Sequence, residues 1–246
     1  RVGGESTSRR AFRVAGERRF RDFRQDNTLD TRQLQVALQR LRQFSGLVDL
    51  PPTEFDVDRT IQDTANSAGL LKVRYKKPRQ NTVKVILLMD SGGSMEHYVQ
   101  LCSALFQAVT KAGHFKDLKI YYFHNCPYTR LYNDPTLNPN NAIPVSWLLA
   151  NLSPEYKLIF VGDAQMSPHE IFDPFPAPRE GEPASGLNCL HRLRDRYRHA
   201  IWLNPGDRPE WGGEWTESYD AIDRLFPMFS LTVEGIEAGM KKLLAR

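Results

Sequence analysis

Cysteine is scarce in this chain: Cys102, Cys126 and Cys189 are the three that occur among 246 residues. Their odd number and wide spacing exclude a disulfide framework and do not match the spacing of zinc ligands. We predict that they pack as small apolar side chains. Such sparse cysteine is typical of a reducing compartment, and we therefore predict a cytoplasmic protein.

Long hydrophobic runs are also absent. No apolar stretch approaches the roughly 20 residues needed to cross a bilayer, and the N-terminus shows no secretory signal pattern. We therefore predict no membrane partner. The hydrophobic share of 41% is ordinary for a globular chain and allows a sizeable core. Because the sequence begins with Arg1 rather than methionine, we expect that an upstream part has been removed.

The chain lacks the motifs of common enzyme classes. It has neither a phosphate-binding Gly-Lys-Ser/Thr loop nor a Gly-x-Ser-x-Gly nucleophile elbow. Residues 90–93 are similar to the nucleophile turn of trypsin-like proteases, but the preceding glycine and the histidine in its cysteine-linked context are missing. A phosphotransferase of the haloacid dehalogenase type would need a second aspartate at position 92, which is Gly92 here. We therefore predict that the protein is not an enzyme.

The most informative stretch is a buried strand followed by a polar turn. Residues 83–89 are almost all apolar, which is typical of a strand buried on both faces of a parallel sheet. The strand ends at Asp90, and two glycines and Ser94 follow. Apolar residues at three- and four-residue spacing then predict a helix that ends near Gly113. Asp90 and Ser94 are thus predicted at the carboxyl end of a central strand, where open α/β sheets bind ligands.

A second apolar strand, over residues 157–161, ends in Gly162 and Asp163. Because the carboxyl ends of parallel strands meet at one edge of the sheet, we expect Asp163 to lie near Asp90. Two carboxylates and the Ser94 hydroxyl form an oxygen-only ligand set, which suits a hard cation such as Mg²⁺ or Mn²⁺. In the alternative interpretation, each aspartate accepts hydrogen bonds from the amides of its own turn.

These pieces, in this order, resemble a known family. A strand that leads into Asp90-Ser91-Gly92-Gly93-Ser94 and a helix, with a later strand-Gly-Asp, is similar to the Asp-x-Ser-x-Ser metal-ion-dependent adhesion site of von Willebrand factor A (VWA) domains. Residues 123–128 and 160–164, with the Arg-rich lead-in, resemble the bacterial CoxE-like branch, and the resemblance extends from Leu29 to Leu244. It implies a loop that binds Mg²⁺ and a protein partner whose acidic residue completes the coordination. It also implies a non-enzymatic adaptor that works with a MoxR-type AAA+ ATPase in the remodelling or maturation of a client protein.

Relative to the family pattern the site is degenerate. The first serine of the pattern falls at position 92, which is Gly92, so we expect Gly92→Ser to raise the metal affinity by restoring a ligand. The family also uses a threonine from a separate loop, and Thr136 and Ser146 are the candidates for it. Two interpretations stay open: weak Mg²⁺ binding with additional waters, or a relic of such a site.

Two further residues are predicted to line the site. His124 and Asn125 follow the strand over residues 118–123, so they should stand at the same sheet end as Asp90. A lone histidine in such a place is commonly a hydrogen-bonded structural residue rather than a ligand. We therefore expect these two side chains to shape the site.

Alternation of strands and helices predicts the α/β class, with a doubly wound, mostly parallel sheet of VWA or Rossmann type. One antiparallel edge strand is expected near residues 130–132. We divide the chain into residues 1–69, a basic arm with a helical extension, and residues 70–246, the VWA-like domain. Residues 71–76 alternate between apolar and basic side chains, which predicts a half-exposed strand whose basic face protects an edge. Asp58 is predicted to cap the helix before it.

The arm over Arg9–Arg24 is dense in arginine, with interleaved phenylalanines. Such composition is found in nucleic-acid-binding segments, and a nucleic-acid-associated protein is the alternative function. Acidic residues dilute the charge, however, and the net charge of +4 says little about partners. We favour an arm that docks on the domain through its phenylalanines, and we do not expect nucleic acid to be a partner.

Overall fold

The computed structural model describes residues 36, 38, 46–47, 51–77, 79–80, 83–111, 115–175, 184–209, 213 and 215–245. The predicted arginine-rich arm lies outside these residues. Of the predicted N-terminal helix, Val36 and Leu38 are described, both in helical conformation, and Leu38 is buried in the core. None of the described helices is long and apolar enough to span a membrane.

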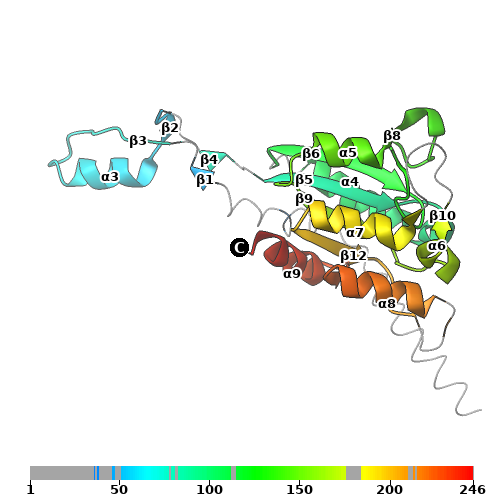
Figure 1. Cartoon of the computed structure of the whole chain (residues 1–246). Helices are drawn as coiled ribbons and strands as arrows, with labels where there is room; N and C mark the ends of the chain where they lie inside the picture. Colours follow the sequence, from blue (N-terminus) through cyan, green and yellow to red (C-terminus); the bar gives the residue numbers. More distant parts are fainter. Residues whose placement is uncertain are drawn as a thin grey trace, which may run out of the picture.

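A seven-stranded sheet organises the described chain, with strand order β13-β12-β9-β5-β6-β7-β8 (Figure 1). Five neighbouring strands are parallel: β13 (Met228–Ser230), β12 (Ala200–Asn204), β9 (Lys157–Val161), β5 (Lys84–Asp90) and β6 (Asp117–Phe123). β7 (Arg130–Tyr132) is antiparallel to β6, and β8 (Ala142–Pro144) is antiparallel to β7. The predicted class and the mostly parallel sheet are confirmed.

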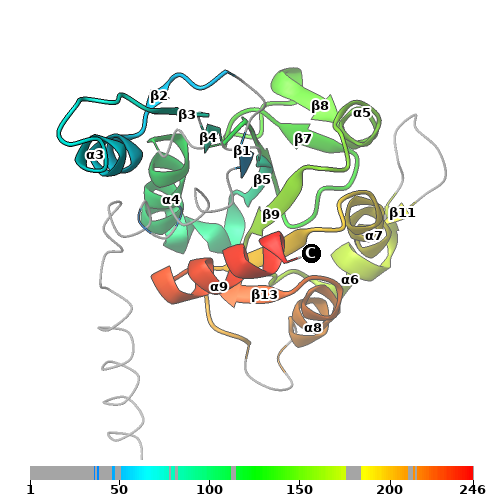
Figure 2. The same cartoon turned by 90° about the vertical axis from the view of Figure 1, so that its left-hand side faces the viewer.

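Helices cover both faces of the sheet, as the doubly wound prediction requires (Figure 2). α4 (Val99–Lys111) and α9 (Val233–Leu244) pack on one face. The other face carries α5 (Val145–Asn151), α6 (Pro168–Phe172), α7 (Gly186–Arg196) and α8 (Thr216–Leu225). Successive residues of β5 alternate between the two cores: Ile86 and Leu88 join one, and Val85, Leu87 and Met89 the other. This is why β5 is apolar at every position from Val85 to Met89.

The edge beyond β6 carries two antiparallel strands rather than the single one predicted. After β7, a 3₁₀ turn, η3 (Pro139–Asn141), returns the chain, and β8 pairs with β7 from Arg130↔Pro144 to Tyr132↔Ala142. Pro144 lies at the end of this outermost strand, where its missing N–H costs no ladder hydrogen bond. The sequence in this region, rich in asparagine and proline, gave no strand signal.

Two short antiparallel pairs precede the sheet: β1 (Gly46–Leu47) with β4 (Arg79–Gln80), and β2 (Glu54–Phe55) with β3 (Tyr75–Lys76). α3 (Val57–Ala65) lies between β2 and β3 in the chain. We call residues 51–77 the α3 unit. In Figure 1 it stands apart from the sheet, on the side where the parallel strands begin. A further pair, β10 (Pro174–Phe175) with β11 (Ala184–Ser185), lies beside α6.

Two details of the α3 unit differ from the sequence prediction. The helix cap is Asp56, whose side chain accepts a hydrogen bond from the Arg59 N–H, while Asp58 lies in the first turn. Only Tyr75–Lys76 of the predicted strand over residues 71–76 forms a ladder, because its partner β2 is two residues long. The predicted domain boundary after residue 69 falls inside the α3 unit and stays a prediction.

Candidate metal centre

Asp90 is the last residue of β5, and its side chain is 7% exposed. Its Oδ1 accepts a hydrogen bond from the Asn125 N–H at 3.0 Å. Asn125 follows β6, the neighbouring parallel strand, and has a positive φ of 55°. The strand register therefore fixes one oxygen of Asp90 and directs the carboxyl group to the sheet end.

Asp163 reaches the same end from the other neighbour of β5. The register pairs Met89 with Val161, so the residues after each strand are adjacent. Gly162 lies against Asp90: a Cβ added at Gly162 would stand 3.0 Å from the Cβ of Asp90. Asp163 is 2% exposed, and its Oδ1 accepts a hydrogen bond from the Gln165 N–H at 3.0 Å. The structure thus brings the two aspartates together, as the sequence predicts.

The environment of Asp90 is, on balance, unfavourable to its charged form. Burial raises the pKa of Asp90 to about 8, and the neighbouring carboxylates Asp163 and Glu170 act in the same direction. Backbone hydrogen bonds from Asn125 and Ser91 oppose the shift. The main influences on this pKa are burial, backbone amides and other carboxylates. A buried carboxylate that lies beside other carboxylates is stabilised by a bound cation.

The turn after β6 links this carboxylate pair to α6. The Nδ2 of Asn125 donates to Oε1 of Glu170 at 2.8 Å, and Oε2 of Glu170 accepts from the Ser167 N–H at 3.0 Å. The Nδ1 of His124 lies 3.0 Å from the carbonyl oxygen of Ser91, so this nitrogen carries a proton. His124 and Asn125 therefore hold the loops around Asp90, in line with the role expected for them.

The loop after Asp90 runs over the sheet end. The Ser91 Oγ donates to the carbonyl oxygen of Pro135 at 2.7 Å, which ties this loop to the one after β7. Gly92 precedes the 3₁₀ helix η2 (Gly93–Tyr98), and Ser94 lies half-buried in its first turn. The loop thus keeps Ser94 at the sheet end, four residues after Asp90.

Comparison with known proteins agrees with this geometry. The family model described as VWA domain containing CoxE-like protein matches residues 28–127. The chain is therefore CoxE-like over residues 28–127, which make up less than half of it. VWA domains mediate protein interactions and often bind divalent cations. Neither the curated proteins nor the solved structures that were compared with the chain include a match.

The VWA match covers Asp90, Ser94, His124 and Asn125, while Asp163 lies beyond it. The match also begins before the α3 unit. It therefore crosses residue 69, where the sequence predicts the boundary of the VWA-like domain. The continuous parallel sheet brings β9, and with it Asp163, to the matched part of the chain. The candidate site therefore combines residues of the matched region with Asp163, which follows β9.

Thr136, one candidate for the missing VWA ligand, makes hydrogen bonds within its own loop. Its Oγ1 donates to Oδ1 of Asp134, which also accepts the Thr136 N–H at 3.0 Å. The loop lies next to the site because Ser91 holds Pro135. Ser146, the other candidate, is exposed in the first turn of α5. Both residues stay predictions, and Thr136 has the nearer link to the Asp90 loop.

Gly92 overturns the expectation that a serine at this position simply restores a ligand. Its φ of 88° and ψ of 178° lie in a region that is essentially restricted to glycine. The obstacle is the backbone, since the nearest atom to an added Cβ, Nδ1 of His124, is 3.6 Å away. A side chain at position 92 therefore requires the turn itself to change.

We expect Gly92→Ser to destabilise the protein by about 1–3 kcal/mol and not to raise its affinity for Mn²⁺. Chemical denaturation and calorimetric titration measure the two effects. Gly93→Ser is a comparison, because Gly93 has a φ of 55°, in the left-handed region that other residues visit at lower cost. A Gly92→Ser protein of unchanged stability and tighter Mn²⁺ binding would show that the turn accepts the serine.

Three supporting residues escaped the sequence prediction. The indole N–H of Trp202, on β12, donates to the Gly162 carbonyl oxygen at 2.7 Å, and the ring stacks on Phe160 with centroids 4.9 Å apart. The Nδ2 of Asn204 donates to the Asp163 carbonyl oxygen at 3.0 Å. Glu170, which the sequence indicated only as part of a helix start, connects Asn125 to α6. These contacts depend on strand order, which no local pattern contains.

The donor set fits a hard cation such as Mg²⁺ or Mn²⁺ better than a softer metal that prefers cysteine or histidine ligands. Among the described residues, no cluster of three or more His, Cys, Asp or Glu side chains could hold a metal by itself. Asp90, Asp163 and Ser94 offer oxygen atoms alone, and a Mg²⁺ ion retains waters where the protein supplies few ligands. Burial and the two aspartates raise the pKa of Cys102 to about 12, so this nearby thiol stays protonated and is a poor metal ligand.

Proposed function

We propose that this protein is a non-enzymatic adaptor that binds an acidic group of a protein partner through a divalent cation held at Asp90, Ser94 and Asp163. The observation that carries the proposal is the meeting of two buried aspartates at adjacent strand ends, where burial and neighbouring carboxylates raise the pKa of Asp90. Mg²⁺ or Mn²⁺ would supply the missing positive charge and an open coordination position for the partner's carboxylate.

The VWA resemblance supports a more specific role. CoxE-like VWA proteins are paired with MoxR-type AAA+ ATPases, and we propose that this chain connects such an ATPase to a client protein during remodelling or maturation. The cysteine pattern fits action in the cytoplasm, since Cys102, Cys126 and Cys189 are all free thiols. The alternative function, nucleic-acid binding, depends on a segment outside the described residues.

Each residue of the candidate metal centre would have a distinct role. Asp90 and Asp163 would bind the cation, with the Ser94 hydroxyl as a third oxygen. Asn125 would orient Asp90 through its N–H, and Gln165 would orient Asp163 in the same way. Because both carboxylates are already fixed by the sheet, little conformational entropy would be lost on binding.

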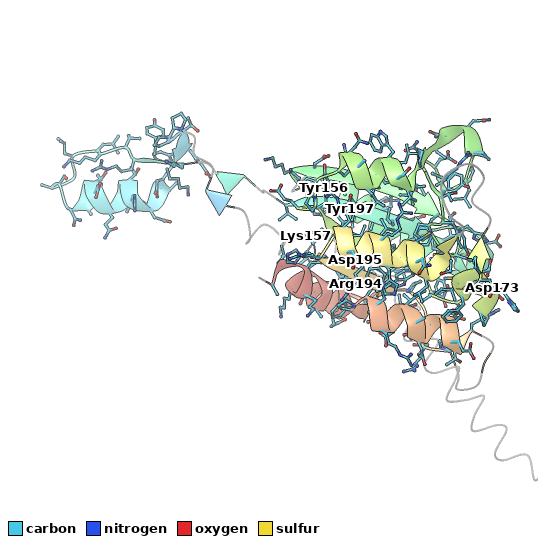
Figure 3. The ribbon with its side chains drawn as sticks, viewed as in Figure 1. Tyr156, Lys157, Asp173, Arg194, Asp195 and Tyr197 are labelled. Atoms are coloured by element: carbon cyan, nitrogen blue, oxygen red, sulfur yellow. The ribbon has the colours of Figure 1, made fainter. Side chains whose placement is uncertain are left out.

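Calorimetric titration with Mn²⁺ tests the cation site. We expect one site per chain, with affinity at least tenfold weaker in Asp163→Asn because one charged ligand is replaced by a neutral one. Glu155→Gln is the matched control, since Glu155 pairs with Lys84 in a largely exposed ion pair. Figure 3 places the neighbouring Tyr156 and Lys157 at the opposite end of the sheet from Asp173, which follows α6.

Equal Mn²⁺ binding by wild type and Asp163→Asn would contradict the cation site. The adaptor role has a separate test: the affinity of the full chain for a MoxR-type ATPase from the same source, measured in Mg²⁺ and in EDTA. A cation-mediated contact should weaken in EDTA and in Asp163→Asn alike. Binding unchanged by both treatments would separate the partner surface from the metal centre.

A further inference from the structure

The α3 unit, residues 51–77, has an inverted burial pattern. Its buried residues are polar, Asp56 and Thr60, and its large apolar side chains are exposed. Of the twelve exposed large apolar side chains among the described residues, seven lie here: Phe55, Val57, Ile61, Leu70, Leu71, Val73 and Tyr75. So dense an exposed apolar surface on a small unit is typical of an interaction site.

Hydroxyl groups, rather than an apolar core, attach the segment before β3 to α3. The Thr64 Oγ1 accepts the Lys72 N–H at 3.1 Å, and the Thr60 Oγ1 accepts the Arg74 N–H at 2.8 Å. On the same side, the Arg74 carbonyl oxygen accepts the Asp56 N–H at 2.9 Å. The backbone groups of residues 72 and 74 are thus directed toward α3 and its cap.

Residues 71 and 73 present their backbone to the other side. In an extended chain, successive backbone N–H and C=O groups point to opposite edges, so Leu71 and Val73 face away from α3. Among the described residues, no hydrogen bond involves the backbone groups of either. This leaves a short open strand edge that continues into β3.

Side chains along this edge divide into two faces. Leu71, Val73 and Tyr75 share one face, where the Tyr75 ring meets Phe55 of β2 edge to face at 6.3 Å between centroids. Lys72, Arg74 and Lys76 share the other face, where Arg74 is paired with Asp63 of α3 and the two lysines carry the remaining positive charge. Lysine on an edge discourages pairing with another copy of the same basic segment. The same charges favour a partner strand with acidic side chains.

We propose that the edge formed by Leu71 and Val73 accepts an extended segment of a partner protein as an added β-strand, with its apolar side chains beside Leu71 and Val73 and its acidic side chains beside Lys72 and Lys76. Like charge disfavours the same basic edge of a second copy as the occupant. The backbone supplies the hydrogen bonds, and the alternation of apolar and basic side chains selects the partner sequence.

This surface is separate from the candidate metal centre. β5 runs from the side of the α3 unit to Asp90 at the other end of the sheet (Figure 1). The proposal therefore stands whether or not a cation binds, and the two surfaces can be occupied together. An adaptor with a client at one end and a second protein at the other would have this arrangement.

A fluorescent synthetic peptide that alternates glutamate and valine tests the inference, with the full chain titrated by fluorescence anisotropy. We expect saturable binding with an affinity tighter than about 1 mM. The same peptide with N-methylated valines keeps every side chain but cannot donate along the edge, and should bind at least tenfold more weakly. A lysine–valine peptide should not bind.

Protein variants locate the contact. Val73→Pro removes an N–H that has no partner in the unit, so it should leave the melting temperature almost unchanged and weaken peptide binding at least tenfold. Val73→Thr keeps the N–H but loses part of the apolar contact, so it should weaken binding much less than Val73→Pro, while Lys72→Glu with Lys76→Glu should weaken binding. Absence of saturable binding, equal binding of the N-methylated peptide, or full binding by Val73→Pro would each overturn the proposal.

Discussion

Replacing Asp90 with asparagine should stabilise the metal-free protein at pH 9, by on the order of 5 kcal/mol, while abolishing Mn²⁺ binding. The gain is expected because burial and the Asp163 carboxylate raise the pKa of Asp90 to about 8, far above the ordinary value of 3.8. Asparagine removes the buried charge and can still accept the Asn125 N–H through its Oδ1. The variant thus separates the effect of the Asp90 charge on stability from its effect on Mn²⁺ binding.

The pH dependence has a definite sign. Between about pH 4 and pH 8, the folded protein holds the Asp90 proton that the unfolded chain releases. The free energy of unfolding should therefore fall as pH rises through this window and level off above about pH 8. Urea denaturation at several pH values, in EDTA, compares wild type with Asp90→Asn. The difference between them should grow across the window, and a constant difference would contradict the raised pKa.

Trp202→Ala should cost about 3–5 kcal/mol of the free energy of unfolding and weaken the candidate metal centre as well. Trp202 is fully buried and stacks on Phe160, so truncation leaves a large cavity in the core. Its indole N–H also holds the Gly162 carbonyl oxygen, which orients the turn that carries Asp163. Denaturation measures the first effect and Mn²⁺ calorimetry the second.

Trp202→Phe separates packing from positioning. Phenylalanine keeps an aromatic ring against Phe160 but leaves the buried Gly162 carbonyl oxygen without its donor, at a cost of about 1–3 kcal/mol. We expect Mn²⁺ affinity to fall in this variant, whereas Phe226→Leu, a core change that removes no hydrogen bond from the Gly162 turn, should leave it unchanged. Wild-type affinity in Trp202→Phe would mean that the turn is held by other contacts.

The sequence was most informative where one local pattern determines both structure and position. β5 is apolar at successive positions because each of its faces meets a helix layer, and that demand is visible in the residues themselves. The Gly162-Asp163 pair follows a similar strand. Position 162 also requires glycine for a steric reason, because an added Cβ would press on both Asp90 and Trp202. The convergence of the two aspartates then follows from parallel strand geometry.

The remaining features depend on contacts distant in sequence. Trp202 and Asn204 support the site only because β12 lies next to β9. The Gly92 backbone conformation is set by the turn over the sheet end, and a glycine at this position looked instead like a missing ligand. The alternation over residues 71–76 predicts a half-exposed strand, whereas the structure exposes its apolar side chains as well. Hydrophobic periodicity identifies the apolar face of a segment, but it does not show whether another part of the chain packs on that face.

The central claim is that Asp90 and Asp163 form one cation site, and a crystal soaked in Mn²⁺ tests it most directly. We predict an anomalous difference peak between the two carboxylates, within coordination distance of at least one of them and near the Ser94 hydroxyl. Loss of this peak in an Asp163→Asn crystal would show that the ion depends on the Asp163 carboxylate. Manganese bound elsewhere, or water alone between the aspartates at saturating Mn²⁺, would contradict the account.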